Sequence, residues 1–211
     1  MTRFSKSYAA ALLAVICVTT GIAVSQSSEI NAIKTANGFV LVWNQPDNYF
    51  TLDIVGKAVK PVTGKNVFFY VDGKVLQVQS LAISEFLGDA KIDHTNGPAV
   101  RAAHRDWEFQ YLEGTLGKKL KLESTTITLK NGSSGLLWSY DMPEDLKVQA
   151  RKQIYLTVLN GENLILLNGV VDSDNSTEVM QNFLKDVALT LRPSTKPIDL
   201  LKLREQVMSE K

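Results

Sequence analysis

The chain has 211 residues, 45% of them hydrophobic, and its 23 basic and 22 acidic residues leave a formal net charge of +1. This balance, without a long basic run, argues against non-specific binding of nucleic acid, because such binding needs a basic face that displaces counterions. Cys17 is the single cysteine in the sequence, so the chain forms no internal disulfide.

The N-terminal segment has the order of a secretory signal peptide. Arg3 and Lys6 precede an apolar run over residues 9–24, and the small residues Ala23 and Ser25 lie at its end. A helix needs roughly 20 apolar residues to cross a bilayer, and this run is shorter. The order predicts export to the periplasm or the extracellular space. Residues 1–25 are expected to be removed near Ser25 and to touch a membrane only before that cleavage.

Two alternatives to cleavage stay open. In the first, the segment remains as an anchor; in the second, a lipid is attached at Cys17, although Ile16 departs from the small residue that bacterial lipoproteins have before the cysteine. Cleavage removes Cys17 and leaves a domain without a thiol nucleophile or thiolate ligand. The chain then divides into a single α+β domain over residues 26–195 and a C-terminal amphipathic tail over residues 196–211.

Turn sequences along the mature chain predict antiparallel hairpins. Asp-Gly and Asn-Gly supply the positive φ angles of tight turns between apolar runs. The predicted strand pairs are residues 38–43 with 49–55, 67–71 with 74–78, 125–130 with 136–140, and 154–159 with 164–171. Alternating apolar and polar residues over 107–111 predict one more strand.

Helices are predicted mainly at the end of the chain. Apolar residues at helical spacing indicate a helix over residues 176–191 and a shorter amphipathic one over residues 198–208. Residues 28–35 and 81–87 are candidates for short helices. The predicted fold class is therefore α+β, a mainly antiparallel sheet covered by helices, with the C-terminal helix packed on the sheet.

Residues 88–103 are predicted to form a long connection, the kind of segment in which function often lies. The candidate ligand or partner surface at and beside it consists of Asp93, His94, His104, Asp106 and Trp107. Zinc accepts imidazole and carboxylate donors, but the spacing of the two histidines is not diagnostic of a metal site. We therefore interpret both histidines as surface residues and assign no metal ligand.

A catalytic signature is missing from the sequence. Ser133 and Ser134 lie in a predicted turn without the spacing of a hydrolase nucleophile. Neither a phosphate-binding glycine loop nor a dinucleotide-binding glycine motif occurs. We predict no catalytic residue and no cofactor. Whether the protein is an enzyme stays open, with a non-catalytic role favoured.

The C-terminal unit carries a family resemblance. It runs through a strand at 154–159, Asn160-Gly161, a strand at 164–171, an acidic stretch at 172–174 and a helix at 176–191. This order of elements resembles the closing unit of PsbP-like and DcrB-like proteins. The resemblance implies an antiparallel sheet between helical layers, in an exported or envelope-associated domain that acts as an accessory or binding subunit without a shared active site.

The sequence thus predicts an exported, non-catalytic binding or accessory domain. Its expected partner is an unidentified protein or small ligand in the cell envelope, and not nucleic acid. One alternative is a metal-assisted hydrolase that uses His94 and His104, which requires the two rings to converge with a third ligand. A second alternative is a structural envelope protein tethered by an uncleaved N-terminus.

Overall fold

The computed structural model describes residues 30–62, 67–87, 91–146 and 148–209. The predicted signal peptide, residues 1–25, lies outside the described residues, as do its cleavage site and Cys17. Within the described part, no helix is both long enough and apolar enough to cross a membrane.

The larger sheet of the described chain has seven strands, and every neighbouring pair in it is antiparallel. In spatial order the strands are β4 (Val59–Val62), β5 (Val67–Val71), β6 (Lys74–Ala82), β10 (Asn163–Val171), β9 (Lys152–Asn160), β8 (Ser134–Asp141) and β7 (Leu122–Thr128). The hairpin of β9 and β10 therefore lies in the middle of the large sheet, where all but three residues of the two strands are buried.

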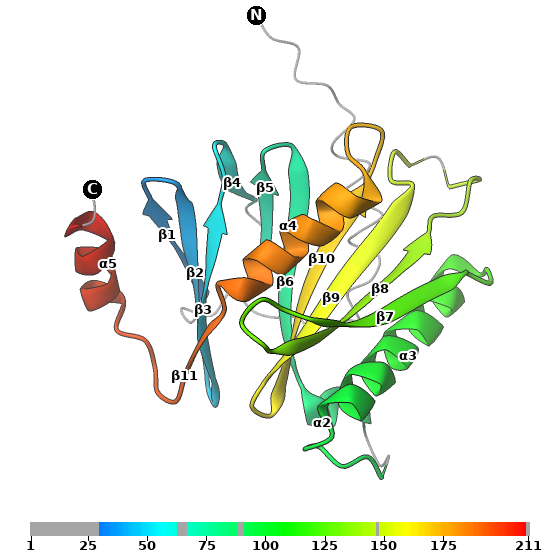
Figure 1. Cartoon of the computed structure of the whole chain (residues 1–211), viewed down its shortest axis with the longest axis horizontal. Coiled ribbons are helices and arrows are strands. Elements are labelled where there is room, and N and C mark those ends of the chain that lie inside the picture. Colours follow the sequence, from blue (N-terminus) through cyan, green and yellow to red (C-terminus); the bar gives the residue numbers. More distant parts are fainter. Residues whose placement is uncertain (1–29, 63–66, 88–90, 147, 210–211) are drawn as a thin grey trace, which may run out of the picture.

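A smaller antiparallel sheet is built from both ends of the described chain. Its strands, in spatial order, are β1 (Ile30–Thr35), β2 (Gly38–Gln45), β3 (Asn48–Val55) and β11 (Arg192–Ser194). The helices are α2 (Ile83–Leu87), α3 (Gly97–Leu116), α4 (Thr177–Leu189) and α5 (Leu200–Ser209). Figure 1 shows α4 lying across the large sheet, with α3 and α5 at opposite ends of the molecule.

Helices α3 and α4 cover opposite faces of the large sheet. Both contact β9, whose side chains alternate between the two faces. Ile154, Leu156 and Val158 pack in a core with α4, whereas Tyr155 packs in a second core with α2 and α3. The small sheet shares the first core with α4, so these two elements cover the same face of the large sheet.

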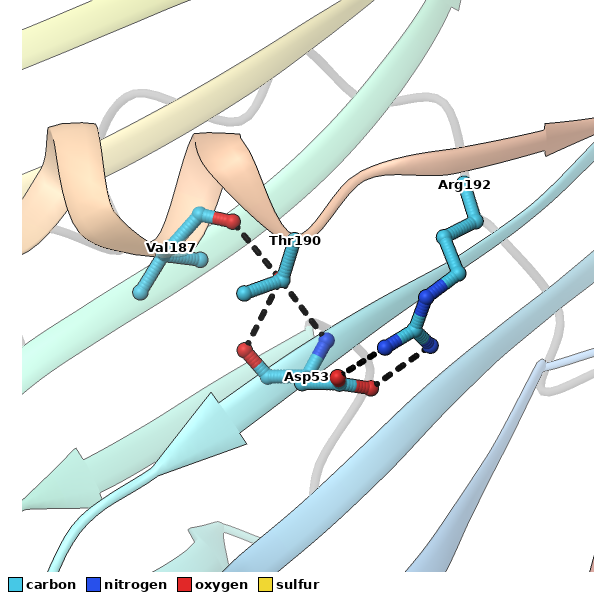
Figure 2. Close-up of polar contacts among 4 residues, drawn as sticks. All are labelled: Asp53, Val187, Thr190 and Arg192. Carbon is cyan, nitrogen blue, oxygen red and sulfur yellow. Dashed lines mark hydrogen bonds and ion pairs between the residues drawn. The ribbon is translucent and has the colours of Figure 1, made fainter. Parts of the chain in front are cut away.

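Side chains at the C-terminal end of α4 fix this helix to the small sheet, as Figure 2 shows. The Thr190 hydroxyl accepts a hydrogen bond from the Asp53 N–H at 2.9 Å. As a donor, the same hydroxyl lies 3.0 Å from the Asp53 carbonyl oxygen and 2.8 Å from the Val187 carbonyl oxygen. The Arg192 guanidinium holds the Asp53 carboxylate with both terminal nitrogens. These contacts set the path of the chain from α4 into β11.

Helix α5 packs on the outer side of the small sheet. Ile198 and Leu203 are among the residues that lie against Val40 and Val42. The Asn44 amide binds the backbone at Ile198 twice, since its Nδ2 donates to the carbonyl at 2.9 Å and its Oδ1 accepts from the N–H at 2.8 Å. The predicted C-terminal tail therefore includes a helix that covers β1 and β2.

The α+β fold class is confirmed, with antiparallel sheets covered by helices and α4 packed on the large sheet. All four predicted hairpins are present, as β2–β3, β5–β6, β7–β8 and β9–β10. The helices predicted at 176–191 and 198–208 correspond to α4 and α5, and the C-terminal part of the 81–87 candidate is α2. Local turn chemistry and apolar spacing were sufficient for these elements.

Three expectations were wrong. Residues 30–35 of the candidate helix at 28–35 form β1, which pairs with β2. Residues 107–111 lie in the middle of α3, and the connection predicted at 88–103 is shortened because α3 begins at Gly97. The helix was missed because the face of α3 that is buried carries polar residues, which leaves no clear apolar stripe to reveal it.

Candidate functional site

The candidate site lies between α3 and the large sheet. Helix α3 is set in place by local signals at both ends. The Asn96 side chain accepts a hydrogen bond from the Ala99 N–H at 3.2 Å, and Pro98 follows in the first turn. Gly117 ends the helix in the left-handed conformation, with φ of 63°. These caps fix where α3 begins and ends.

The inner face of α3 is mostly polar. Its buried residues are Val100, Arg101, His104, Glu108 and Leu112, which recur at the three- and four-residue spacing of one helical face. His104 has no exposed surface, and Arg101 and Glu108 are 3% and 5% exposed. Basic, imidazole and carboxyl side chains are rarely buried together without partners.

A row of polar and aromatic side chains crosses the sheet below α3. Trp138 of β8 is paired with Tyr155 of β9, Tyr155 with Asn168 of β10, and Asn168 with Gln77 of β6. Their exposed fractions are 1%, 2%, 2% and 4%. Directly paired residues share one face of a sheet, and Trp138 and Tyr155 pack in the core that contains α3. We call these four side chains the cross-strand row.

Gln153 joins two tyrosines beside this row. Its Oε1 accepts hydrogen bonds from the hydroxyls of Tyr140, at 3.0 Å, and Tyr155, at 2.5 Å. The rings of Trp138 and Tyr155 are stacked with centroids 3.9 Å apart. Burial is the main cause that raises the pKa of Tyr140 and of Tyr155. The charge of Glu108 raises both pKa values further, so Glu108 lies near this cluster. Both hydroxyls therefore stay protonated at neutral pH.

Many polar atoms of this interface have no hydrogen-bond partner in the described chain. They are Gln77 Nε2, Arg101 Nε, both ring nitrogens of His104, Glu108 Oε1, Trp138 Nε1, Gln153 Nε2, and the amide nitrogen and oxygen of Asn168. Asn168 lies close enough to Tyr155 to oppose the rise of its pKa, yet neither amide atom makes a hydrogen bond of standard geometry. We call these seven residues, together with Tyr140 and Tyr155, the buried polar layer.

Burial changes the protonation of this layer. It lowers the pKa of His104 from 6.5 to about 3 and raises the pKa of Glu108 from 4.5 to about 8. At neutral pH the imidazole is uncharged and offers one donor and one acceptor, while the protonated carboxyl of Glu108 offers a donor. Arg101 keeps its charge, because a guanidinium is not deprotonated in proteins.

The predicted site residues separate into two groups. His104 belongs to the buried polar layer, and the partly buried Trp107 lies beside it with ring centroids 6.1 Å apart. Asp93, His94 and Asp106 are exposed. Asp93 accepts hydrogen bonds from Thr95, His94 Nδ1 lies 3.3 Å from Glu162 Oε2, and Asp106 pairs with Arg105.

The structure therefore does not join the two histidines into a common site. His94 is on the surface, whereas the interpretation of His104 as a surface residue was wrong, because α3 turns this side chain onto the sheet. No group of three or more His, Cys, Asp and Glu side chains that could hold a metal occurs in the described residues.

Sequence reasoning missed every residue of the layer except His104. One usable signal was present. Asn168 interrupts the apolar run of β10, in which every residue is buried, and an amide in the middle of such a strand indicates a buried polar site.

A hollow lies on the surface near the ends of α3 and β8, with a volume of about 670 Å³. Lys118, Lys119 and Lys121 line it, but they pair with Asp145, Glu113 and Glu123 respectively. The cations of this rim are thus largely neutralised.

No protein-family model matches the chain, and no curated protein matches it. Solved structures similar to it include cyanobacterial PsbP (CyanoP) from Synechocystis sp. PCC 6803, at 12% identity over 83% of this chain and 97% of that chain, with a TM-score of 0.45. LpqN, involved in cell envelope biogenesis of Mycobacterium tuberculosis, is similar at 13% identity over 79% of this chain and 80% of that chain, with a TM-score of 0.26.

A PsbP protein is among the similar structures, and the antiparallel sheet between helical layers that the resemblance implied is present. At such low identity and TM-scores, neither similarity supports an argument about the function of this chain. The resemblance to DcrB-like proteins stays a prediction.

Proposed function

We propose that this chain is an exported, non-catalytic binding domain that holds a small polar ligand between α3 and the large sheet. The observation that carries the proposal is the buried polar layer, whose unpartnered hydrogen-bonding atoms come from both sides of this one interface. Export rests on the order of residues 1–25, which is that of a signal peptide.

The energetic argument starts from the cost of such atoms. A buried donor or acceptor without a partner costs about 1–3 kcal/mol. The chain builds an apolar interface on the other face of the same sheet, where Met180, Leu184 and Val187 of α4 are buried. Several unpaired polar groups beneath α3 are thus a local liability, and a ligand with matching donors and acceptors would remove it.

The residue types of the layer are those of a small-molecule site. Small-molecule sites in proteins are mostly apolar and aromatic, with a few polar groups that orient the ligand. The stacked Trp138 and Tyr155 supply an aromatic surface, and Asn168 and His104 each offer donor and acceptor capacity. The groups that titrate nearest neutrality, His104 and Glu108, are uncharged at pH 7, so the ligand meets mainly neutral hydrogen-bonding groups.

Native mass spectrometry tests the proposal. The purified chain is incubated with a small-molecule extract of the host envelope, separated from unbound molecules and weighed without denaturation. We expect a non-covalent adduct of small-molecule mass on the wild type. Asn168→Leu, which keeps the shape of the side chain but removes two unpartnered polar atoms, should lose the adduct without losing thermal stability.

Asn48→Leu is the matched control. Asn48 is also a buried asparagine, but its Nδ2 donates to Ser80 Oγ at 2.8 Å, outside the layer. This variant should unfold at a lower temperature and retain the adduct. A wild type that takes up no adduct, with ordered waters on Asn168 and His104 in a high-resolution crystal structure, would contradict the proposal, because buried water would then satisfy the layer.

A further inference from the structure

Arg101 is a buried cation without an anionic partner among the described residues. It is 3% exposed, and its one hydrogen bond within this part of the chain is from Nη2 to the Ser134 hydroxyl at 2.9 Å, while Nε has no partner there. No ion pair of the described residues includes Arg101. Because a buried charge is strongly destabilising unless it is paired, this guanidinium lacks the group that usually accompanies it.

The position of the guanidinium on α3 increases this need. A Cβ built on Gly97 would lie 3.2 Å from Arg101 Nη1, so the guanidinium lies beside the first residue of the helix. That end of a helix carries partial positive charge and disfavours a cation. A bound anion would be attracted both by Arg101 and by the end of the helix.

We infer that the ligand of the buried polar layer carries a carboxylate that pairs with Arg101. This inference rests on the proposed function and names the class of ligand. A carboxylate matches the planar fork of a guanidinium and accepts two parallel hydrogen bonds from it. Nε and a terminal nitrogen of Arg101 form such a fork, and Nε is free to donate.

The charge balance favours a monoanion. Arg101 is the single arginine or lysine of the layer, and the neighbouring His104 is neutral at pH 7 because burial lowers its pKa. A phosphate dianion would leave excess negative charge in the interior. The rise of α3 places Glu108 roughly 10 Å along the axis from Arg101, so the rest of the ligand extends from Arg101 toward His104 and Glu108.

The test compares benzoate with benzamide, which have similar shape but differ in charge. Each is titrated into the full chain, and binding is followed by the Arg101 Nε–Hε signal in ¹H–¹⁵N spectra and by thermal stability. Benzoate should shift this signal and raise the unfolding temperature in a saturable way, and benzamide should bind about 10- to 100-fold more weakly. Arg101→Gln should remove this preference.

Ser134→Ala is the control. It removes the hydroxyl that Arg101 contacts but leaves the charge of Arg101 in place, so this variant should still bind benzoate more tightly than benzamide. If the extract adduct of the previous experiment persists unchanged on Arg101→Gln, or if benzoate binds this variant as well as the wild type, the carboxylate inference fails and the proposed function stands. A response to inorganic phosphate but not to benzoate also overturns it. If no adduct and no probe response occur on the wild type, both proposals fail.

Discussion

The two long helices of this protein cover the same sheet in opposite ways. Helix α4 places Met180, Leu184 and Val187 on one face, where they join a continuous apolar core. Helix α3 places Arg101, His104 and Glu108 on the other face, opposite the cross-strand row. One sheet thus has an interface that stabilises the fold and another that keeps hydrogen-bonding capacity unused.

The two interfaces differ in the free energy that their buried polar groups cost. Apolar burial on the α4 side contributes roughly 25 cal/mol per Å² of apolar surface removed from water. Polar burial on the α3 side costs free energy for every atom that finds no partner. Apolar residues also pack on the α3 side, among them Phe86, Val100 and Leu112, but the unpartnered polar atoms between them add no stability, which is why we propose ligand binding there.

Substitution of one buried residue on each helix should show the largest difference in stability between the two interfaces. Leu184→Ala should lower the free energy of unfolding by about 2–5 kcal/mol, because it opens a cavity in the apolar core. His104→Leu should change it by less than about 1 kcal/mol or raise it, because two unpartnered nitrogens are removed. Urea denaturation measures both. A loss on His104→Leu as large as that on Leu184→Ala would show that the α3 interface is packed like an ordinary core.

The pH dependence of stability should come from the α3 side. His104, with its pKa lowered to about 3, contributes stability that is present above pH 6.5 and is lost as the pH falls toward 3. Glu108, with its pKa raised to about 8, contributes stability that is present below pH 4.5 and is lost as the pH rises toward 8. Between pH 4.5 and 6.5 the two slopes, each at most about 1.4 kcal/mol per pH unit, oppose one another.

Glu108→Gln isolates one of these two slopes. The variant should lack the loss of stability that the wild type shows as the pH rises from 6.5 to 8, and between pH 4.5 and 6.5 it should gain stability with pH where the wild type is nearly flat. Thermal or urea unfolding across this range is the measurement. Parallel profiles for the two proteins would mean that Glu108 is not held protonated by burial.

The smallest expected change in stability concerns the N-caps, a feature that the two helices share. Each begins at a side-chain cap, Ser176 Oγ accepting from the Val179 N–H and Asn96 Oδ1 accepting from the Ala99 N–H, both at 3.2 Å. Ser176→Ala and Asn96→Ala should each cost about 1 kcal/mol in urea unfolding. Clearly unequal costs would mean that the helices differ in their ends as well as in their inner faces.

Prediction from the sequence succeeded where local pattern and tertiary environment agree. Helix α4 has a Ser176 cap and apolar residues at helical spacing, and the hairpin of β5 and β6 has Asp72-Gly73 with positive φ at both residues. Helix α3 failed because its buried positions are polar. The chance alternation of Trp107, Phe109 and Tyr111 then imitated a strand.

The candidate site was predicted only in part for the same reason. His104 was singled out as a titratable side chain, but it was grouped with Asp93, His94 and Asp106, which are its neighbours in sequence and lie on the surface. Apart from Arg101 and Glu108 of α3 itself, the residues that share its site come from β6, β8, β9 and β10. Pairing across strands depends on contacts far apart in the chain, and a single sequence does not contain their register.

The sequence by itself determined the antiparallel hairpins, the helix α4, the α+β class and the expectation of export, because turn residues, apolar periodicity and the N-terminal pattern act over short distances. Only the tertiary structure decided that α3 is a helix, that its polar face is the buried one, and that Arg101 lies there without an anionic partner in the part of the chain that the structure describes. The physical reason is that burial is set by what packs against a residue, and for α3 this is a row of side chains from four strands.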